Sequence, residues 1–240
     1  MKTIFKSLLA VALVMLCGSV LAQEAAIRKN LTERLPQLKG IDEVSKTPIP
    51  GVYELRVNGT DIYYTDAQGN YLIEGNIIDL RSKRNLTEER VTKLTAVKFE
   101  DLPFKDAFTI VRGNGKRRMA VFEDPNCGYC KRFERDLQKV DNVTIYMFLY
   151  PILGADSGDK SKAIWCAKDQ GKAWQDWMVR DQPVPAVQAG CDTTALARNV
   201  ELGRGYKITG TPTLIFIDGS RVPGAVDTKQ VEKMLADAKG

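Results

Sequence analysis

The chain has 240 residues, of which 44% are hydrophobic and 27% are charged, so its composition is that of one or two globular domains and excludes a disordered or collagen-like chain. The formal charge of +5 comes from interleaved basic and acidic residues, without a basic block that would indicate binding to nucleic acid. The sequence contains no histidine, which excludes Ser-His and Cys-His nucleophile pairs and most catalytic zinc sites. We expect neither a bound metal nor a cofactor.

Residues 1–22 have the features of a cleaved secretory signal. Lys2 and Lys6 make the start positive, an apolar run from Leu8 to Leu16 follows, and small residues lead up to Ala22. The apolar run is shorter than the roughly 20 residues that a membrane helix needs. We therefore predict cleavage after Ala22 and export of a soluble mature protein.

Residues 23–84 are expected to form a small domain of one helix and an antiparallel sheet. Apolar side chains follow helical spacing over residues 24–38, and the spacing changes to the alternation of strands after Pro50. Strands are expected at residues 53–57, 62–65, 71–73 and 77–80, with a hairpin turn at Asn58-Gly59. A sheet this small has open edges and a marginal core, which favours pairing with a second copy; the alternative is packing on the rest of its own chain.

A linker helix is expected over residues 85–96, because Asn85 and Glu88 have the spacing of a helix cap. Residues 97–240 then read as a mixed α/β domain with a helical insertion. Strands are expected at residues 108–111, 119–122, 143–149 and 214–217 and at Val222, and helices at 127–139, across the insertion that carries three tryptophans, and at 228–238.

Four cysteines remain after removal of the signal, which contains Cys17. Reading Cys17 as a lipid attachment site is disfavoured by its bulky neighbour Leu16. The four others allow three disulfide pairings on paper. Their spacing favours one local pair, Cys127 with Cys130, and one distant pair, Cys166 with Cys191.

The local pair lies where a strand ends and a helix begins. Amides of the first helical turn stabilise a thiolate, so Cys127 is the expected nucleophile and Cys130 its shielded partner. A metal site would need two more ligands, and a purely structural bridge across two residues would stabilise the fold only weakly. For Cys166 and Cys191 the longer loop gives about 3.5 kcal/mol, which favours a structural disulfide.

These residues resemble a known family. The motifs are similar to those of the DsbC/DsbG family of the thioredoxin superfamily: Cys127-Gly128-Tyr129-Cys130, Ala163-Ile164-Trp165-Cys166-Ala167-Lys168-Asp169, Gly210-Thr211-Pro212 and Val222-Pro223-Gly224. The resemblance implies a thioredoxin-like catalytic domain with a helical insertion, preceded by a cystatin-like α+β dimerisation domain and a linker helix. It also implies a cis Thr211-Pro212 bond. Substrate-binding residues are then Gly128, Tyr129, Thr211 and Pro212.

The function that the resemblance implies is periplasmic disulfide isomerisation with chaperone activity. Misfolded secreted proteins with wrong disulfides would enter the cleft of a V-shaped homodimer, and an inner-membrane reductase of the DsbD type would keep Cys127 and Cys130 reduced. The alternatives are a DsbG-like reductase or chaperone, a simple dithiol oxidase, and a holdase with secondary redox chemistry. Thr211 favours the isomerase, while Asp124 as a proton relay to Cys130 and Lys131 as a charge beside the thiolate stay open.

Overall fold

The computed structural model describes residues 22–38 and 40–238. The expected secretory signal lies outside these residues, except for Ala22 at its end. The chain divides into two compact units, of which the first ends at Leu94 and the second begins at Thr95. In the part of the chain that the structure describes, no helix is long and apolar enough to cross a membrane.

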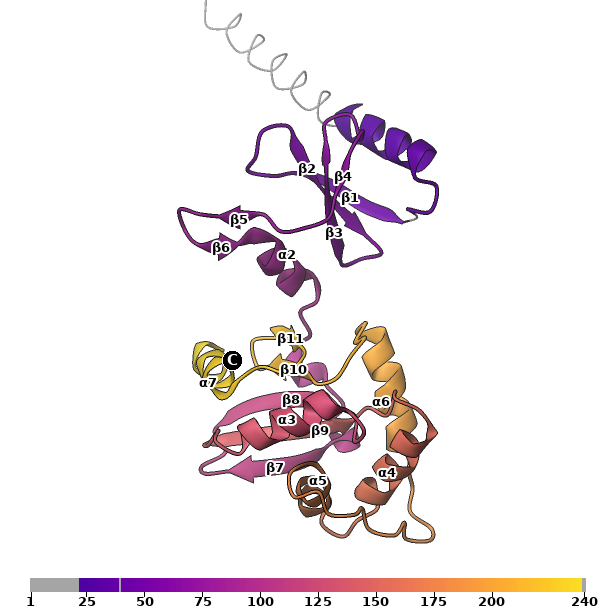
Figure 1. The fold of residues 1–240 in the computed structure, drawn as a ribbon, viewed down its shortest axis with the longest axis vertical. Helices are drawn as coiled ribbons and strands as arrows, with labels where there is room; N and C mark the ends of the chain where they lie inside the picture. The colour runs from indigo at the N-terminus through magenta and orange to yellow at the C-terminus, as the bar shows by residue number, and fades with distance from the viewer. Residues whose placement is uncertain (1–21, 39, 239–240) are drawn as a thin grey trace, which may run out of the picture. The chain divides into compact units, whose positions relative to one another are not determined.

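The first unit consists of a helix over residues 22–34 and a four-stranded antiparallel sheet in the order β1-β2-β3-β4 (Figure 1). Ile27 and Leu31 of the helix pack on Leu55 and Val57 of β2, which point to one face of the sheet because strand side chains alternate. The strands are β1 (Ile41–Lys46), β2 (Val52–Val57), β3 (Asp61–Asp66) and β4 (Leu72–Ile73). The expected hairpin forms at Asn58-Gly59, where both residues have positive φ.

Two features of this unit differ from the expectation. Strand β1 was not predicted, because Ile41 and Val44 are its only large apolar residues and it forms by pairing with β2. The expected linker helix forms as α2 (Leu86–Leu94) after a short hairpin of β5 (Ile78–Asp79) and β6 (Arg84–Asn85).

Helix α2 is fixed to the first unit. Its start is capped as expected, because the Glu88 amide donates to Asn85 Oδ1 at 3.2 Å. On its other face Arg90 donates to Glu43 and to Glu54, at 2.8 Å each. The helix is thereby held against the first unit, at whose end it lies.

The second unit is built on a five-stranded sheet in the order β11-β10-β8-β9-β7. Strands β8 and β9 are parallel and are joined through α3, whereas the other pairs are antiparallel. The strands are β7 (Phe108–Arg112), β8 (Arg117–Glu123), β9 (Val143–Leu149), β10 (Thr213–Phe216) and β11 (Arg221–Pro223). The helices are α3 (Gly128–Leu137), α4 (Ala155–Trp165), α5 (Gln170–Met178), α6 (Thr194–Gly205) and α7 (Thr228–Asp237), with single 3₁₀ turns at Phe99–Asp101 and Phe104–Asp106.

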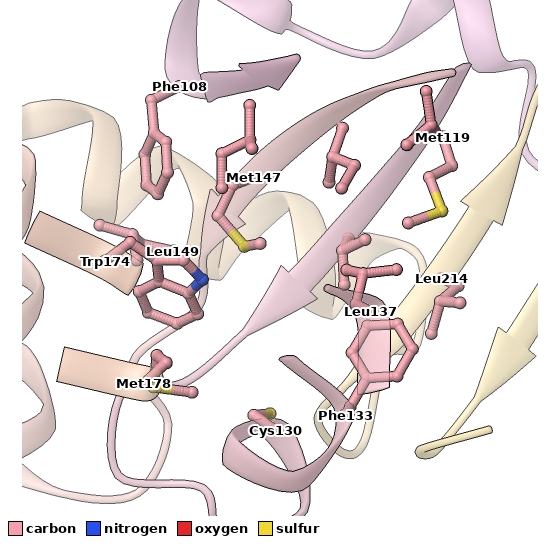
Figure 2. Packing of buried hydrophobic residues seen from close by; sticks show 14 of the residues in the cluster. Phe108, Met119, Cys130, Phe133, Leu137, Met147, Leu149, Trp174, Met178 and Leu214 are labelled. Carbon is pink, nitrogen blue, oxygen red and sulfur yellow. The ribbon is translucent and has the colours of Figure 1, made fainter. Parts of the chain in front are cut away.

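Alternation along β8 sends its side chains into two separate cores. Met119 and Val121 join the core that contains Cys130 of α3 and Trp174 of α5, which Figure 2 shows. Ala120 and Phe122 point to the opposite face, which the chain segment around Phe99 covers. With both faces buried, the sheet holds the end of β8 and the start of α3 firmly in place.

Candidate active site

Cys127 is the N-cap residue of α3. Its Sγ accepts a hydrogen bond from the Cys130 amide at 3.3 Å, so the sulfur occupies the place that a Ser or Asp oxygen takes at other helix starts. Cys127 is 6% exposed and Cys130 is fully buried. Cys127, the expected nucleophile, is thus less open to solvent than the sequence suggested, and its Sγ lies against the Thr211 carbonyl.

The surroundings of Cys127 favour its thiolate. Its pKa is lowered from 9.0 to about 5, chiefly by a hydrogen bond from the Cys130 side chain, and further by hydrogen bonds from the Thr211 side chain and from the backbone of Cys130 and Tyr129. Burial acts in the opposite direction. The helix amides contribute as expected, but the neighbouring thiol contributes more.

Cys130 has the opposite character. Burial raises the pKa of its thiol far above the ordinary value, and the hydrogen bond to Cys127 and the charge of Glu123 add to the rise. The two sulfurs therefore have unequal roles in the reduced protein, since one is a thiolate at neutral pH and the other keeps its proton.

Asp124 holds the loop in front of the dithiol. Its carboxylate is fully buried and accepts hydrogen bonds from the amides of Asn126, Ile152 and Leu153 at 2.8 to 3.0 Å. These bonds tie the end of β8 to the segment after β9. The Asp124 carboxylate is therefore engaged by three backbone amides. These contacts do not support a role for Asp124 in relaying protons to Cys130.

The Lys131 side chain contacts Asp181 and Trp177 rather than the Cys127 sulfur. Its ammonium group donates to Asp181 at 3.0 Å and lies 4.2 Å from the centre of the Trp177 ring. The same indole donates from Nε1 to the Pro125 carbonyl at 2.6 Å. Lys131 therefore braces the loop before Cys127 instead of pointing at the sulfur.

The expected substrate-binding residues gather around the dithiol. The Thr211-Pro212 bond is cis, and Cys127 Sγ lies 3.2 Å from the Thr211 carbonyl, to which the protonated thiol donates. Gly128 and Tyr129, which follow Cys127 in the first turn of α3, are exposed, and Tyr129 is 64% accessible. An added Cβ at Gly128 would meet no atom within 4 Å, so there is open space beside the start of α3.

Cys166 and Cys191 form a disulfide with a Cα–Cα distance of 5.9 Å. It joins the end of α4 to the segment that leads into α6, so it fastens the helical insertion rather than the dithiol site. Within residues 22–38 and 40–238, no three side chains of the metal-binding types gather into a cluster.

Two glutamates at the site were missed by sequence reasoning. Glu123 ends β8 and Glu134 lies on α3, and both are fully buried beside the dithiol. The only signal in the sequence was an acidic residue directly after the apolar run Met119–Phe122, where a buried strand would continue.

Comparison with known proteins is in keeping with this geometry. Residues 104–239 match the model of a thioredoxin-like domain, and residues 18–88 match that of a disulfide bond isomerase protein N-terminal domain. A probable thiol:disulfide interchange protein DsbC from Bordetella pertussis is 44% identical over 215 residues, which cover 89% of this chain and 74% of the relative. The chain belongs to the DsbC family.

Other DsbC relatives and a solved structure agree. The thiol:disulfide interchange protein DsbC of Escherichia coli K12 is 29% identical over 225 residues, covering 91% of this chain and 89% of the relative. The crystal structure of a disulfide interchange protein from Neisseria gonorrhoeae matches with a TM-score of 0.53 and 38% identity, over 57% of this chain and 97% of that one. The DsbC family assignment confirms the expected fold class, and thiol-disulfide interchange is the activity of this enzyme.

Proposed function

We propose that the chain is a disulfide isomerase in which Cys127 is the attacking thiolate and Cys130 the resolving thiol. The observation that carries this assignment is the pair of opposite thiol environments, with the pKa of Cys127 lowered to about 5 and that of Cys130 raised. The Cys127 thiolate attacks a substrate disulfide and forms a mixed disulfide. A substrate thiol then rearranges it, or Cys130 attacks Cys127 and releases the substrate reduced.

The substrate segment would lie along Cys127, between the start of α3 and the Thr211 loop. Gly128 leaves space at the helix start, Tyr129 offers an accessible ring, and the backbone around Thr211 and the buried Pro212 forms the facing edge. Backbone contacts of this kind accept many sequences, which suits an enzyme that acts on varied misfolded chains.

Isomerisation requires a reduced dithiol. A thiolate that is stabilised in the reduced protein makes the Cys127–Cys130 disulfide more oxidising, and each pKa unit corresponds to roughly 30 mV. Such a site accepts electrons readily from a reductase. We therefore propose a periplasmic location after cleavage of residues 1–22, with reduction by an inner-membrane protein of the DsbD type.

The first unit supplies a surface for a homodimer. We assign residues 23–84 to dimerisation, residues 85–96 to the connection and residues 97–240 to catalysis. Large apolar side chains are exposed beside the edge strand β4, where Tyr71 is 68% accessible, and after β5, where Leu80 is 83% accessible. A short edge strand with exposed apolar neighbours favours pairing with a second copy.

The test is reactivation of a multi-disulfide protein with scrambled bridges, in a limiting redox buffer. The wild type should restore activity, and Cys127→Ser should not. Ile73→Lys places a charge on the edge strand β4, where Ile73 is 49% exposed, and should give a monomer that keeps dithiol reactivity but loses most reshuffling. Sedimentation of the wild type as a monomer would refute the dimer, and reactivation by Cys127→Ser would refute the isomerase.

A holding activity is the second candidate, favoured by apolar side chains beside the site. Leu153 is 53% exposed and follows the segment that Asp124 ties to the dithiol loop. Together with Tyr129 it would hold apolar stretches of an unfolded chain. Cys127→Ser should keep this activity, so suppression of aggregation by that variant separates holding from redox chemistry.

A further inference from the structure

Residues 124–127 form a β-turn between the end of β8 and the start of α3. The bond that closes the turn runs from the Cys127 amide to the Asp124 carbonyl, at 3.0 Å. Cys127 is therefore both the last residue of the turn and the N-cap of α3, where its φ of -77° and ψ of 114° place Sγ opposite the Cys130 amide. The conformation of the turn thus determines where the sulfur lies.

The residue types of the turn are compatible with two turn types. Pro125 occupies the second position, where proline suits types I and II alike. Asn126 occupies the third position, and asparagine is one of the few residues that accept the positive φ of a type II turn there. Asn126, unlike Asn58 and Asn142, lies outside the positive-φ region, so the turn is of type I. Because the two types differ by a flip of the central peptide, the contacts of that peptide decide between them.

Side chains hold both polar groups of the central peptide. Its N–H, from Asn126, donates to Asp124 Oδ1 at 2.8 Å, and its carbonyl, from Pro125, accepts from Trp177 Nε1 at 2.6 Å. A flip would turn both groups away from these partners. Asp124 lies within the turn itself, whereas Trp177 lies on α5, 52 residues after Pro125. Trp177 is thus a contact from outside the turn that favours type I.

Two ammonium groups lie against the Trp177 ring. Lys131 Nζ from α3 is 4.2 Å from the centre of the ring, and Lys160 Nζ from α4 is 4.5 Å from it. Lys160 also donates to Asn126 Oδ1 at 2.8 Å, and Asn126 Nδ2 donates to Asp156 at 2.7 Å. The indole is therefore held by α3 and α4 as well as by its own helix, so the donor that binds the turn has little freedom to move.

We propose that Trp177 is a positioning residue for thiol-disulfide interchange, which keeps the turn before α3 in its type I form and thereby keeps Cys127 Sγ at the N-cap. The proposal rests on the role of Cys127 as the attacking thiolate. Trp177 acts through the backbone of the turn. The helical insertion, to which α5 belongs, thus takes part in preparing the dithiol for reaction.

Loss of this contact should reduce the amount of reactive thiolate. When the central peptide can flip, Cys127 spends less time with its sulfur facing the amides of Tyr129 and Cys130, which help to lower its pKa. The net contribution of a single neutral hydrogen bond is small. We therefore expect the thiolate fraction to fall about two- to fivefold at a pH below the Cys127 pKa, and to stay unchanged where Cys127 is fully ionised.

The experiment measures the rate of Cys127 alkylation by iodoacetamide in the reduced mature chain, from pH 4 to pH 8, in wild type and in Trp177→Phe. Phenylalanine keeps a ring for Lys131 and Lys160 and removes the Nε1–H donor. The variant should react about two- to fivefold more slowly than wild type at pH 4 and at the wild-type rate at pH 8. A packing defect without an effect on the thiolate would instead lower the rate equally at every pH.

Trp165→Phe is the matched control. Trp165 Nε1 donates to the Asp192 carbonyl at 2.9 Å, beside Cys191 of the structural disulfide. This variant loses the same kind of indole-to-carbonyl bond in the same unit, so its alkylation profile should be that of wild type. Hydrogen exchange of the Asn126 amide reports the turn directly, and it should become about two- to fivefold faster in Trp177→Phe but not in Trp165→Phe.

The possible results separate this proposal from the proposed function. Absence of acid-range reactivity at Cys127 in wild type would refute the role of Cys127 itself. With that reactivity present, an unchanged or uniformly lowered profile in Trp177→Phe would refute the positioning role alone. Should Trp177→Phe not fold, the wild type decides, because the bond to Pro125 requires the Trp177 indole N–H to be protected from exchange with solvent, and rapid exchange of this proton overturns the proposal.

Discussion

Removal of the Cys130 thiol should weaken Cys127 as an acid. The hydrogen bond from the Cys130 side chain is the largest cause of the lowered Cys127 pKa. A hydrogen bond to a charged acceptor contributes about 1.5–3 kcal/mol, and one pKa unit corresponds to about 1.4 kcal/mol. Cys130→Ala should therefore raise the Cys127 pKa by about one to two units, to between about 6 and 7.

The assay is the rate of Cys127 alkylation by iodoacetamide as a function of pH, supported by the ultraviolet absorbance of the thiolate. At pH 5 the variant should react about five- to fiftyfold more slowly than the wild type, and the two rates should converge above the variant's pKa. Cys130→Ser is the matched control. Its hydroxyl replaces the donor, so its Cys127 should titrate close to the wild type.

Two results would refute this reasoning. If Cys130→Ala titrated at the wild-type pH, the neighbouring thiol would not stabilise the thiolate. If its pKa rose to the ordinary value of 9.0, the Thr211 contact and the helix amides would contribute nothing, contrary to their geometry.

Further predictions concern labelling, the second disulfide, loop stability and acid. In the reduced protein at pH 7, mass mapping should find Cys127 alkylated before Cys130, because only Cys127 is a thiolate. Mild reductant that opens the catalytic pair should leave Cys166–Cys191 intact, because that bridge closes a 25-residue separation and Cys166 is buried. Asp124→Ala should lower the free energy of unfolding by about 2–4 kcal/mol, since three amides lose a buried acceptor. The pKa of folded Cys127 lies below its unfolded value, so its thiolate stabilises the reduced protein fully above pH 9 and loses this effect as the pH falls towards 5.

Each of these has a control or a contrary outcome. Faster labelling of Cys130 would reverse the assigned roles, and equal reduction of all four thiols would remove the distinction between the two disulfides. Asp124→Asn keeps an acceptor and should cost less than Asp124→Ala in urea unfolding; equal costs would contradict the capping role. For the acid effect, Cys127→Ser should lack the pH-dependent difference between reductant-treated and oxidised samples.

Elements with strong local patterns could be predicted from the sequence. Strand β9 has the predicted bounds Val143–Leu149, because a continuous apolar run between polar turns has few other stable forms. Strand β1 could not be predicted, since residues 41–46 carry few apolar side chains and become a strand only through hydrogen bonds to β2. Its stability comes from tertiary pairing, which local propensity does not contain.

The residues of the dithiol site also divide into those that a local sequence pattern indicates and those that only the fold brings together. Cys127 and Cys130 lie close in the sequence, and their spacing indicates a dithiol site. Glu123 and Glu134 come from a strand and a helix that are brought together only by the fold. The sequence pointed to an acid before the dithiol but selected Asp124. Backbone amides of the segment after β9 donate to Asp124, whereas Glu123 interacts with Cys130. No local pattern in the sequence indicates these contacts.

The second unit contains all three tryptophans, so it can be followed by tryptophan fluorescence, whereas the first unit cannot. Trp165, Trp174 and Trp177 all follow Thr95, and no tryptophan occurs earlier in the sequence. Trp174 bonds Glu134, and Trp177 lies against Lys131 and the Pro125 carbonyl, so charge changes near the dithiol alter the environment of both indoles. Tryptophan fluorescence will therefore report redox state and unfolding of the catalytic unit alone, whereas circular dichroism senses both units, and separate melting of the two will appear as unequal midpoints.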